Sequence, residues 1–313
     1  MKKILIVLAV AIVGLVLIFL FKTDEQVYQS VYRGNERETF RILFVGDLMF
    51  DRTIRTTAEK NGYDYLFSCI GDYLRGFDLV VGNLEGPITN ETSVSQNTKP
   101  SEVGNTTFTF DIDVAKTLFK NNIKMVNLGN NHILDFGLMG RDSTERELSR
   151  ASVGYFGSPG DSIMATTTLY GYTLAIINFN QFIGENNPQK TISAIGQASG
   201  IADLVAVYTH WGDEYVLATE YEKTLAHSFI DAGADIVIGS HPHIIQEHEI
   251  YRGKNIYYSL GNFIFDQYFM DEVKIGGGVE IVFAGDEFSE REVSEKEVLF
   301  DIHPDGTTCL AEN

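Results

Sequence analysis

Six short polar clusters carry residue types that could do chemistry, and each directly follows an apolar, strand-like run. The clusters occupy positions 46–49, 83–85, 130–132, 210–212, 241–243 and 259–262. In an α/β protein, ligands gather outside the carboxyl ends of the strands. Asp, Glu, Asn and His side chains placed together at such an edge can bind metal ions. The pattern therefore predicts a metal site and favours a metal-dependent hydrolase.

The histidines at 241 and 243 are the most specific of these signals. Pro242 biases His241 toward extended backbone, and alternate residues of an extended chain point the same way. Both imidazoles should therefore face one point, as metal ligands do. The alternative is a pair of surface histidines in a turn. Their position directly after the apolar run ADIVIGS argues against it.

Further candidate ligands follow other strands. His210 ends an apolar strand, although a lone histidine there could be a satisfied core residue. Asp47 and Glu85 are carboxylates that can bridge cations. Asp47 could instead cap a helix, and the asparagines at 130–131 could instead form an ordinary turn, which asparagine favours. Together, the predicted metal ligands are Asp47, Glu85, Asn131, His210, His241 and His243. Such mixed nitrogen and oxygen ligands suit one or two divalent ions of Mn, Zn or Fe, without choosing among them.

Two neighbouring side chains have expected roles beside the metal. His132 could give a proton or a hydrogen bond to a leaving group or an oxyanion. Glu214 could accept the second ring N–H of a ligand histidine and so orient that ring. His132 and Asp47 are the predicted catalytic residues.

Alternating strands and helices must position these clusters. The near-continuous apolar run at 41–46 is typical of a strand buried on both faces. Residues 89–107 are rich in Ser, Thr and Asn and predict a long exposed loop that could cover the site, while 181–200 show no clear pattern. Helical spacing occurs at 64–74, 111–122, 137–150 and 219–232. With no internal repeat, this alternation favours one α/β domain over two.

Composition narrows the class of partner. The chain has 313 residues with 44% hydrophobic content, which is enough for a sizeable core, and a formal net charge of −19. Nucleic-acid binding relies on clustered Lys and Arg, so this balance excludes nucleic acid as an expected partner.

Cys69 and Cys309 could pair, but they lie far apart in a chain without a disulfide framework. We expect two unpaired thiols.

The N-terminus predicts a membrane anchor. Residues 4–21 are uninterrupted apolar residues or glycine between lysines, which is near the length needed to cross a bilayer. No small-residue cleavage site follows, so a retained helix is favoured over a signal peptide. The expected organisation is an anchor at 1–22, a stalk at 23–39 and one domain at 40–313. The flanking charges favour a single-pass protein of the cell membrane with its C-terminal domain outside the cytoplasm.

Six segments together resemble the CapA/PgsA family of poly-γ-glutamate capsule proteins. They are GDLMFDR, NLEGPI, NLGNNHILDFG, THWGDEY, GADIVIGSHPHIIQ and YSLGNFIFD, in that order from about 41 to about 266. That family is similar to the calcineurin-like metallophosphoesterases. The resemblance implies a four-layer α/β/β/α sandwich with a di-metal site.

The same resemblance assigns roles to individual residues. Asp47 matches the first metal-binding aspartate, Asn131 and His132 match a metal ligand and a proton donor, and three histidines match ligands: His210, His241 and His243. Asn83 and Glu85 fall in the segment of the bridging carboxylate. Asn262 and Asp266 belong to a segment expected to line the site. Met49 stands where the wider superfamily has a ligating histidine, so the resemblance implies one weaker metal position.

Family membership would imply a role in making or exporting anionic poly-γ-glutamate alongside membrane subunits of a polymer synthase. The expected activity is metal-dependent hydrolysis of a phosphoester or of the polymer. The alternative is a non-catalytic accessory subunit that binds anionic surface polymer through a metal-containing groove.

Overall fold

The computed structural model describes residues 39–98, 102–160, 163–183, 187–284 and 292–312. Most of them belong to one compact unit, Phe40–Val282 with Val293–Asn313. A second unit, Met1–Thr39 with Phe283–Glu292, lies mostly outside the described residues. The larger unit contains every cluster singled out by the sequence.

Two sheets form the larger unit. The first has the strand order β14-β13-β12-β1-β2-β3-β4, and β11 pairs in parallel with the end of β1. Its strands are β1 (Phe40–Leu48), β2 (Leu79–Leu84), β3 (Ile123–Asn127), β4 (Gly154–Phe156), β11 (Asn262–Ile264), β12 (Ile275–Ala284), β13 (Glu292–Ile302) and β14 (Thr308–Leu310). Strands β1 to β4 pair in parallel, so their carboxyl ends share one edge.

The second sheet has the order β5-β6-β7-β8-β10-β9. Its strands are β5 (Met164–Leu169), β6 (Tyr172–Asn180), β7 (Leu204–His210), β8 (Ile236–Ser240), β9 (His248–Tyr251) and β10 (Lys254–Tyr257). Strands β6, β7, β8 and β10 are parallel. The predicted apolar runs therefore become buried parallel strands, as their lack of alternation indicates.

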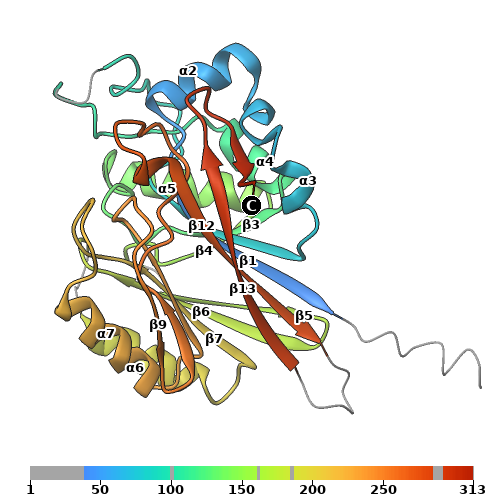
Figure 1. Ribbon diagram of the computed structural model, residues 1–313. Coiled ribbons are helices and arrows are strands. Elements are labelled where there is room, and N and C mark those ends of the chain that lie inside the picture. The colour runs from blue at the N-terminus through green and yellow to red at the C-terminus, as the bar shows by residue number, and fades with distance from the viewer. Residues whose placement is uncertain (1–38, 99–101, 161–162, 184–186, 285–291, 313) are drawn as a thin grey trace, which may run out of the picture. The chain divides into compact units, whose positions relative to one another are not determined.

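Helices cover the outer faces of both sheets (Figure 1). Apolar side chains of α2 (Arg52–Asn61), α4 (Asp113–Lys120) and α5 (Gly137–Arg150) join the core of the first sheet. Those of α6 (Pro188–Ala198) and α7 (Glu220–Asp231) join the core of the second sheet. Short turns of helix complete the set: η1 (Tyr63–Phe67), α3 (Gly71–Leu74) and η2 (Glu272–Lys274). This mixed α/β arrangement of two sheets fits the predicted sandwich.

A tyrosine joins the two sheets at their buried interface. The Tyr208 hydroxyl on β7 donates a hydrogen bond to the Val45 carbonyl on β1 at 2.6 Å. Its ring lies 6.4 Å from the ring of Phe44 and 6.1 Å from that of Phe156, measured between centroids. Because the hydroxyl is fully buried, this bond satisfies a polar group that would otherwise be costly to bury. It also fixes the carboxyl ends of β1 and β7 beside each other.

Some local expectations were wrong. The segment at 181–200, which shows no clear sequence pattern, contains α6, capped by the Asn187 side chain and begun by Pro188. The helical spacing at 64–74 forms two short pieces, η1 and α3, instead of one helix. In both segments the helical pattern of the sequence is weak. Each segment is instead held in place by a few side chains that pack in the hydrophobic core, such as Ile195 in α6 and Leu66 in η1.

The prediction of a transmembrane helix ahead of this fold is corrected. Among the described residues, no helix is long and apolar enough to cross a membrane. The longest of them, α5, has 14 residues, whereas a spanning helix needs about 20. The run at 4–21 lies outside the described residues. The expected single-pass membrane location and external domain are corrected with it.

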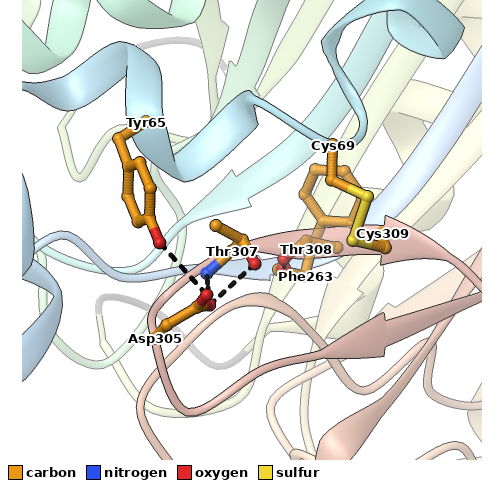
Figure 2. The surroundings of a disulfide bond; sticks show 7 residues. All are labelled: Tyr65, Cys69, Phe263, Asp305, Thr307, Thr308 and Cys309. Atoms are coloured by element: carbon orange, nitrogen blue, oxygen red, sulfur yellow. Dashed lines mark hydrogen bonds between the residues drawn. A yellow bond between two sulfur atoms is a disulfide. The ribbon is translucent and has the colours of Figure 1, made fainter.

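The expectation of two unpaired thiols was wrong. Cys69 and Cys309 form a disulfide, with their Cα atoms 5.1 Å apart despite a sequence separation of 240 residues. Figure 2 shows this bond joining the segment after η1 to β14. Asp305, in the turn before β14, accepts a hydrogen bond from the Tyr65 hydroxyl at 3.1 Å. The β13–β14 hairpin brings the two cysteines together, which sequence spacing alone does not reveal.

The disulfide predicts a measurable loss of stability on reduction. A cross-link between distant residues restricts the unfolded chain and typically contributes about 2–4 kcal/mol. We expect urea unfolding of the C69S/C309S variant to show a loss of that order relative to the oxidised protein. Dithiothreitol should destabilise the wild type and leave the variant unchanged. Equal unfolding free energies for the oxidised protein and the variant would contradict this prediction.

Candidate metal centre

The carboxyl ends of strands from both sheets meet at the candidate site. Asp47 on β1 is in register with Asn83 on β2 and with Asn262 on β11. In the other sheet, His210 at the end of β7 is in register with Ser240 at the end of β8. Parallel pairing in register brings these side chains to one edge.

A close approach between Gly46 and Gly261 allows the ends of β1 and β11 to lie side by side. A Cβ built on Gly46 would lie 1.9 Å from the Gly261 carbonyl oxygen. The same carbonyl accepts a hydrogen bond from the Asp47 amide at 3.0 Å. Any larger residue at 46 would push β11 away from β1. The glycine therefore sets the distance between Asp47 and the loop that carries Asn262.

Two groups of buried side chains have the geometry of candidate metal sites. One group contains Glu85, His210 and His241, and the other contains Asp47, Glu85 and His243. Within each group, the potential ligand atoms lie within 4.8 Å of one another. Glu85 belongs to both groups. A carboxylate in that position can bridge two cations.

Glu85 provides the strongest sign that the residues fit a cation. It is fully buried, and neither carboxylate oxygen has a hydrogen-bond partner among the described residues. Burial, followed by the charge of Asp47, raises the pKa of Glu85 well above its usual value. Burying a carboxylate without a partner is costly. A divalent cation between these oxygens and the histidine nitrogens would remove that cost.

The histidines of the first group are held neutral. Burial lowers the pKa of His210 well below its usual value, and burial together with His243 lowers that of His241 to about 4. Neutral imidazole is the form that binds metal. The His241 Nδ1 atom is buried and has no hydrogen-bond partner within the described part of the chain. It is therefore available as a ligand atom.

The Ser240 hydroxyl orients the His210 ring, and the second ring nitrogen of His210 faces Asn131. The Nδ1 atom of His210 lies 3.0 Å from the Ser240 hydroxyl oxygen. Its Nε2 atom lies 2.9 Å from Asn131 Oδ1. Two ligands of one ion, each about 2.1 Å from it and at right angles, would lie roughly 3 Å apart. Asn131 Oδ1 thus lies beside the first group, close enough to share an ion with His210.

The second group is held by two asparagines. Asn83 Nδ2 donates to Asp47 Oδ1 at 2.8 Å, and Asn262 Oδ1 lies 3.0 Å from His243 Nδ1. His243 Nε2 remains 3.8 Å from Glu85 Oε1. Met49 is part of the hydrophobic core, and its sulfur accepts a hydrogen bond from the Asp51 amide at 2.9 Å. It therefore contributes no ligand, and this group has fewer ligands than the first.

The backbone of the His241–His243 segment differs from the extended form expected from Pro242. His241 has φ of 101° and His243 has φ of 59°, both in the left-handed region. The two rings converge because of these turns, with centroids 5.9 Å apart. The His241 amide donates to Asp47 Oδ2 at 3.1 Å. Such a conformation is costly for a residue other than glycine and persists where the surroundings impose it, often at functional sites.

His132 stands at the edge of the site with one nitrogen fixed. Its Nδ1 atom lies 2.9 Å from Asp135 Oδ2. Its Nε2 atom lies 3.9 Å from Glu85 Oε1. The Phe108 ring packs on the imidazole with centroids 4.4 Å apart. This arrangement aims Nε2 at the metal ligands.

The remaining predicted site residues take different places. Glu214 is exposed, and among the described residues it has no hydrogen bond to a histidine, so Ser240 and Asn262 do the orienting expected of it. Asp266 lines a cavity of about 330 Å³ that His132 and His243 also line. There it pairs with Arg52.

Sequence reasoning missed a buried network of asparagines beneath the ligands. Asn127 and Asn130 donate to Asn83 Oδ1 at 2.9 and 3.1 Å, and Asn178 donates to Asn127 Oδ1 at 2.9 Å. The side-chain amide of Asn178 thus orients Asn127, Asn127 orients Asn83, and Asn83 orients Asp47. The signal was present, because Asn127 and Asn178 end or nearly end apolar strands. Arg52, three residues after Met49, was also missed.

Comparisons with known proteins agree on one family. The family model described as bacterial capsule synthesis protein PGA_cap matches residues 41–267. The chain is 33% identical over 243 residues to the PGA biosynthesis protein CapA of Bacillus subtilis (strain 168), covering 72% of this chain and 63% of that protein. It is 31% identical over 288 residues to the capsule biosynthesis protein CapA of Bacillus anthracis, covering 85% and 69%. The match thus spans less than two thirds of the Bacillus subtilis relative.

One solved structure supports the fold alone. It is that of a hypothetical protein from Thermus thermophilus, with a TM-score of 0.51 and 17% sequence identity. The match covers 82% of this chain and 98% of that chain.

The shared position of Glu85 predicts that one substitution removes metal binding. Gln in place of Glu85 keeps the shape of the side chain but removes the charge that both groups share. We expect E85Q to retain little zinc after incubation and gel filtration, measured by mass spectrometry of the metal. The matched control E214Q removes an exposed carboxylate nearby and should retain zinc. Wild-type zinc content in E85Q would contradict the assignment.

The low pKa of His241 predicts how the metal-free protein responds to acid. Between pH 6.5 and about 4, the unfolded chain binds a proton at this histidine and the folded chain does not. Stability should therefore fall as pH drops through that window, by up to about 1.4 kcal/mol per pH unit from this group. Thermal unfolding in a chelator should show a shallower pH dependence for H241N, whose asparagine tolerates positive φ. Identical slopes for both proteins would disprove the effect.

Proposed function

The chain belongs to the PGA_cap family of bacterial capsule synthesis proteins, and we propose that it is a metal-dependent hydrolase acting in the synthesis or export of a poly-γ-glutamate-type polymer. One observation carries the proposal. Glu85, a buried carboxylate without a hydrogen-bond partner among the described residues, belongs to both groups of potential ligands. This arrangement suits two divalent cations sharing one bridge.

In this proposal the ligands divide into two sets with Glu85 in common. A first ion would be held by Glu85, Asn131, His210 and His241. A second would be held by Asp47, Glu85 and His243. When bound, such ions lower the pKa of a coordinated water and polarise the bond under attack.

His132 acts as the proton donor to the leaving group. Asp135 accepts the Nδ1 proton, which leaves Nε2 directed at the site. The Phe108 ring keeps the imidazole plane fixed. A protonated Nε2 in this position can deliver its proton to the leaving oxygen or nitrogen as the bond breaks. Asp135 stabilises the charged imidazole before that transfer.

The substrate in this proposal is a phosphoester or a γ-glutamyl amide bond in an anionic polymer. The partners are the membrane subunits of a polymer synthase. The names of the two CapA relatives, which mention PGA biosynthesis and capsule biosynthesis, support the choice of polymer. The acidic composition of the chain argues only against nucleic acid. The synthase subunits are proposed from the family resemblance.

A second candidate function is a non-catalytic accessory subunit that binds anionic polymer through the metal site. The position of Met49 favours it, since this side chain lies in the core and leaves the Asp47 and His243 group one ligand poorer. Bound metal without turnover of either substrate class would select this function.

Two substitutions test the hydrolase. We expect H241A to abolish metal-dependent hydrolysis, because it removes a ligand. H132Q should retain metal and lower kcat by about 10²–10⁴, the usual contribution of a general acid. Hydrolysis of bis(p-nitrophenyl) phosphate and of γ-linked glutamate oligomers, with and without chelator, is the measurement.

The matched control is H227Q, since His227 pairs with Glu249 on β9 and belongs to neither candidate metal group. It should hydrolyse as the wild type does. Retained metal-dependent turnover in H241A would refute the proposed catalytic centre.

A further inference from the structure

A cavity of about 330 Å³ adjoins the candidate metal centre. His132 and His243 form part of its wall on the side of the metal ligands. Aromatic rings, carboxamides and hydroxyls form most of the rest: Phe108, Phe265, Phe269, Tyr215, Asn105, Gln267, Thr53, Thr98 and Thr106. The charged side chains among the described residues of the wall are Arg52, Glu214 and Asp266. The cavity therefore offers one fixed positive charge beside apolar surfaces.

Arg52 is held rigidly in this wall. Its Nη2 atom pairs with Asp266 Oδ1, and its Nη1 atom donates to Asn105 Oδ1 at 3.4 Å. Asp266 is fixed in turn, because its other oxygen accepts bonds from the Thr53 amide at 3.1 Å and the Thr53 hydroxyl at 2.8 Å. The side chain of Arg52 is only 12% exposed. The structure thus retains a nearly buried cation in one orientation.

Two phenylalanines connect this cation to the metal centre. The Arg52 guanidinium lies 5.1 Å from the Phe108 ring and 5.4 Å from the Phe265 ring. Phe108 contacts His132, and Phe265 contacts His243, with ring centroids 4.4 and 4.7 Å apart. Arg52 is therefore one aromatic ring away from the proposed proton donor and from a metal ligand. A group bound at Arg52 would lie next to the bond being cleaved.

The donors of Arg52 are only partly used. A guanidinium carries five N–H groups, and planar pairing with carboxylate is its preferred mode. Among the described residues, its hydrogen bonds go to Asn105 and Asp266 alone. The unused N–H groups of Nη1 and Nη2 can therefore serve a ligand in the cavity.

We propose that this cavity is a substrate subsite in which Arg52 binds a carboxylate of the residue flanking the scissile bond. This assignment rests on the proposed function, which supplies an acidic polymer as substrate. The phenylalanine faces suit the methylene groups of such a residue, and Asn105 and Gln267 suit its amide. Asp266 holds the guanidinium in place and is a positioning residue.

The charges in the wall favour a carboxylate over a phosphate. Among the described lining residues, Glu214 and Asp266 share the cavity with one positively charged side chain, Arg52. A dianionic phosphate would meet two carboxylates and only one fixed positive side chain. A singly charged, planar carboxylate meets less repulsion and matches the fork of the guanidinium.

Binding of two matched probes to the zinc-loaded full chain tests the subsite. One probe is γ-linked triglutamate, and the other carries carboxamides in place of its α-carboxylates. We expect calorimetric titration to show at least about tenfold tighter binding of the acid, as a charge-assisted hydrogen bond would give. R52Q should remove this preference and leave the affinity for the amide unchanged.

Two further variants keep the test decisive. R75Q removes an exposed arginine whose only side-chain hydrogen bond among the described residues goes to Asp72, and it should keep the full preference. R52K retains the charge but not the fork, so its preference should fall between those of wild type and R52Q. If R52Q does not fold, the binding preference of R52K is the result that tests the subsite. Equal binding of both probes to wild type, no binding of either, or an unchanged preference in the Arg52 variants would overturn the subsite.

The outcome is separable from that of the hydrolase test. A preference lost in R52Q without any turnover supports the subsite and rejects hydrolysis. Turnover that depends on His241, with a preference unaffected in R52Q, supports hydrolysis and rejects the subsite. Loss of zinc in R52Q would show a structural role and overturn the subsite.

Discussion

The site depends on one electrostatic constraint, which is that a fully buried carboxylate must meet positive charge. Glu85 has no hydrogen-bond donor on either oxygen among the described residues, and Asp47 adds a second negative charge nearby. Two of the histidines nearby favour the neutral form, since burial lowers the pKa of both His210 and His241. Without a cation, burial and the charge of Asp47 raise the pKa of Glu85 and so favour its protonated form. The chain therefore encloses acidic groups that a divalent ion could neutralise, and binding of such an ion would be coupled to the stability of the fold.

Both sheets contribute to this enclosure, so neither could form it alone. Asp47 comes from the first sheet and accepts a hydrogen bond from the His241 amide, which follows a strand of the second. His210 comes from the second sheet and meets Asn83 Nδ2 of the first at 3.3 Å. Tyr208 and the asparagine network hold the two edges together below the ligands. The left-handed backbone at His241 is maintained by this double attachment. The cost of that conformation is consistent with a site shaped for binding.

The sequence was sufficient to predict which side chains gather at the candidate site but not what surrounds them. Asp47, His210 and His241 each follow an apolar parallel strand, and parallel strands deliver their ends to one edge whatever the details of packing. The orientation of the histidine rings could not be predicted in this way, because Ser240 and Asn262 act on histidines that are distant from them in sequence. The expectation for Glu214 rested only on its closeness to His210 along the chain. The disulfide depends on where a terminal hairpin docks. The cavity around Arg52 forms only where separate loops meet, and no periodicity marks such a meeting.

Anomalous X-ray diffraction from crystals soaked in zinc tests the central claim most directly. The account predicts an anomalous peak about 2.0–2.2 Å from a Glu85 carboxylate oxygen. Nitrogen atoms of His210 and His241 should complete its surroundings, and a second peak should lie between Glu85, Asp47 and His243 at higher zinc concentration. Well-ordered crystals in which zinc binds only at the surface, with Glu85 still without a partner, would contradict the account.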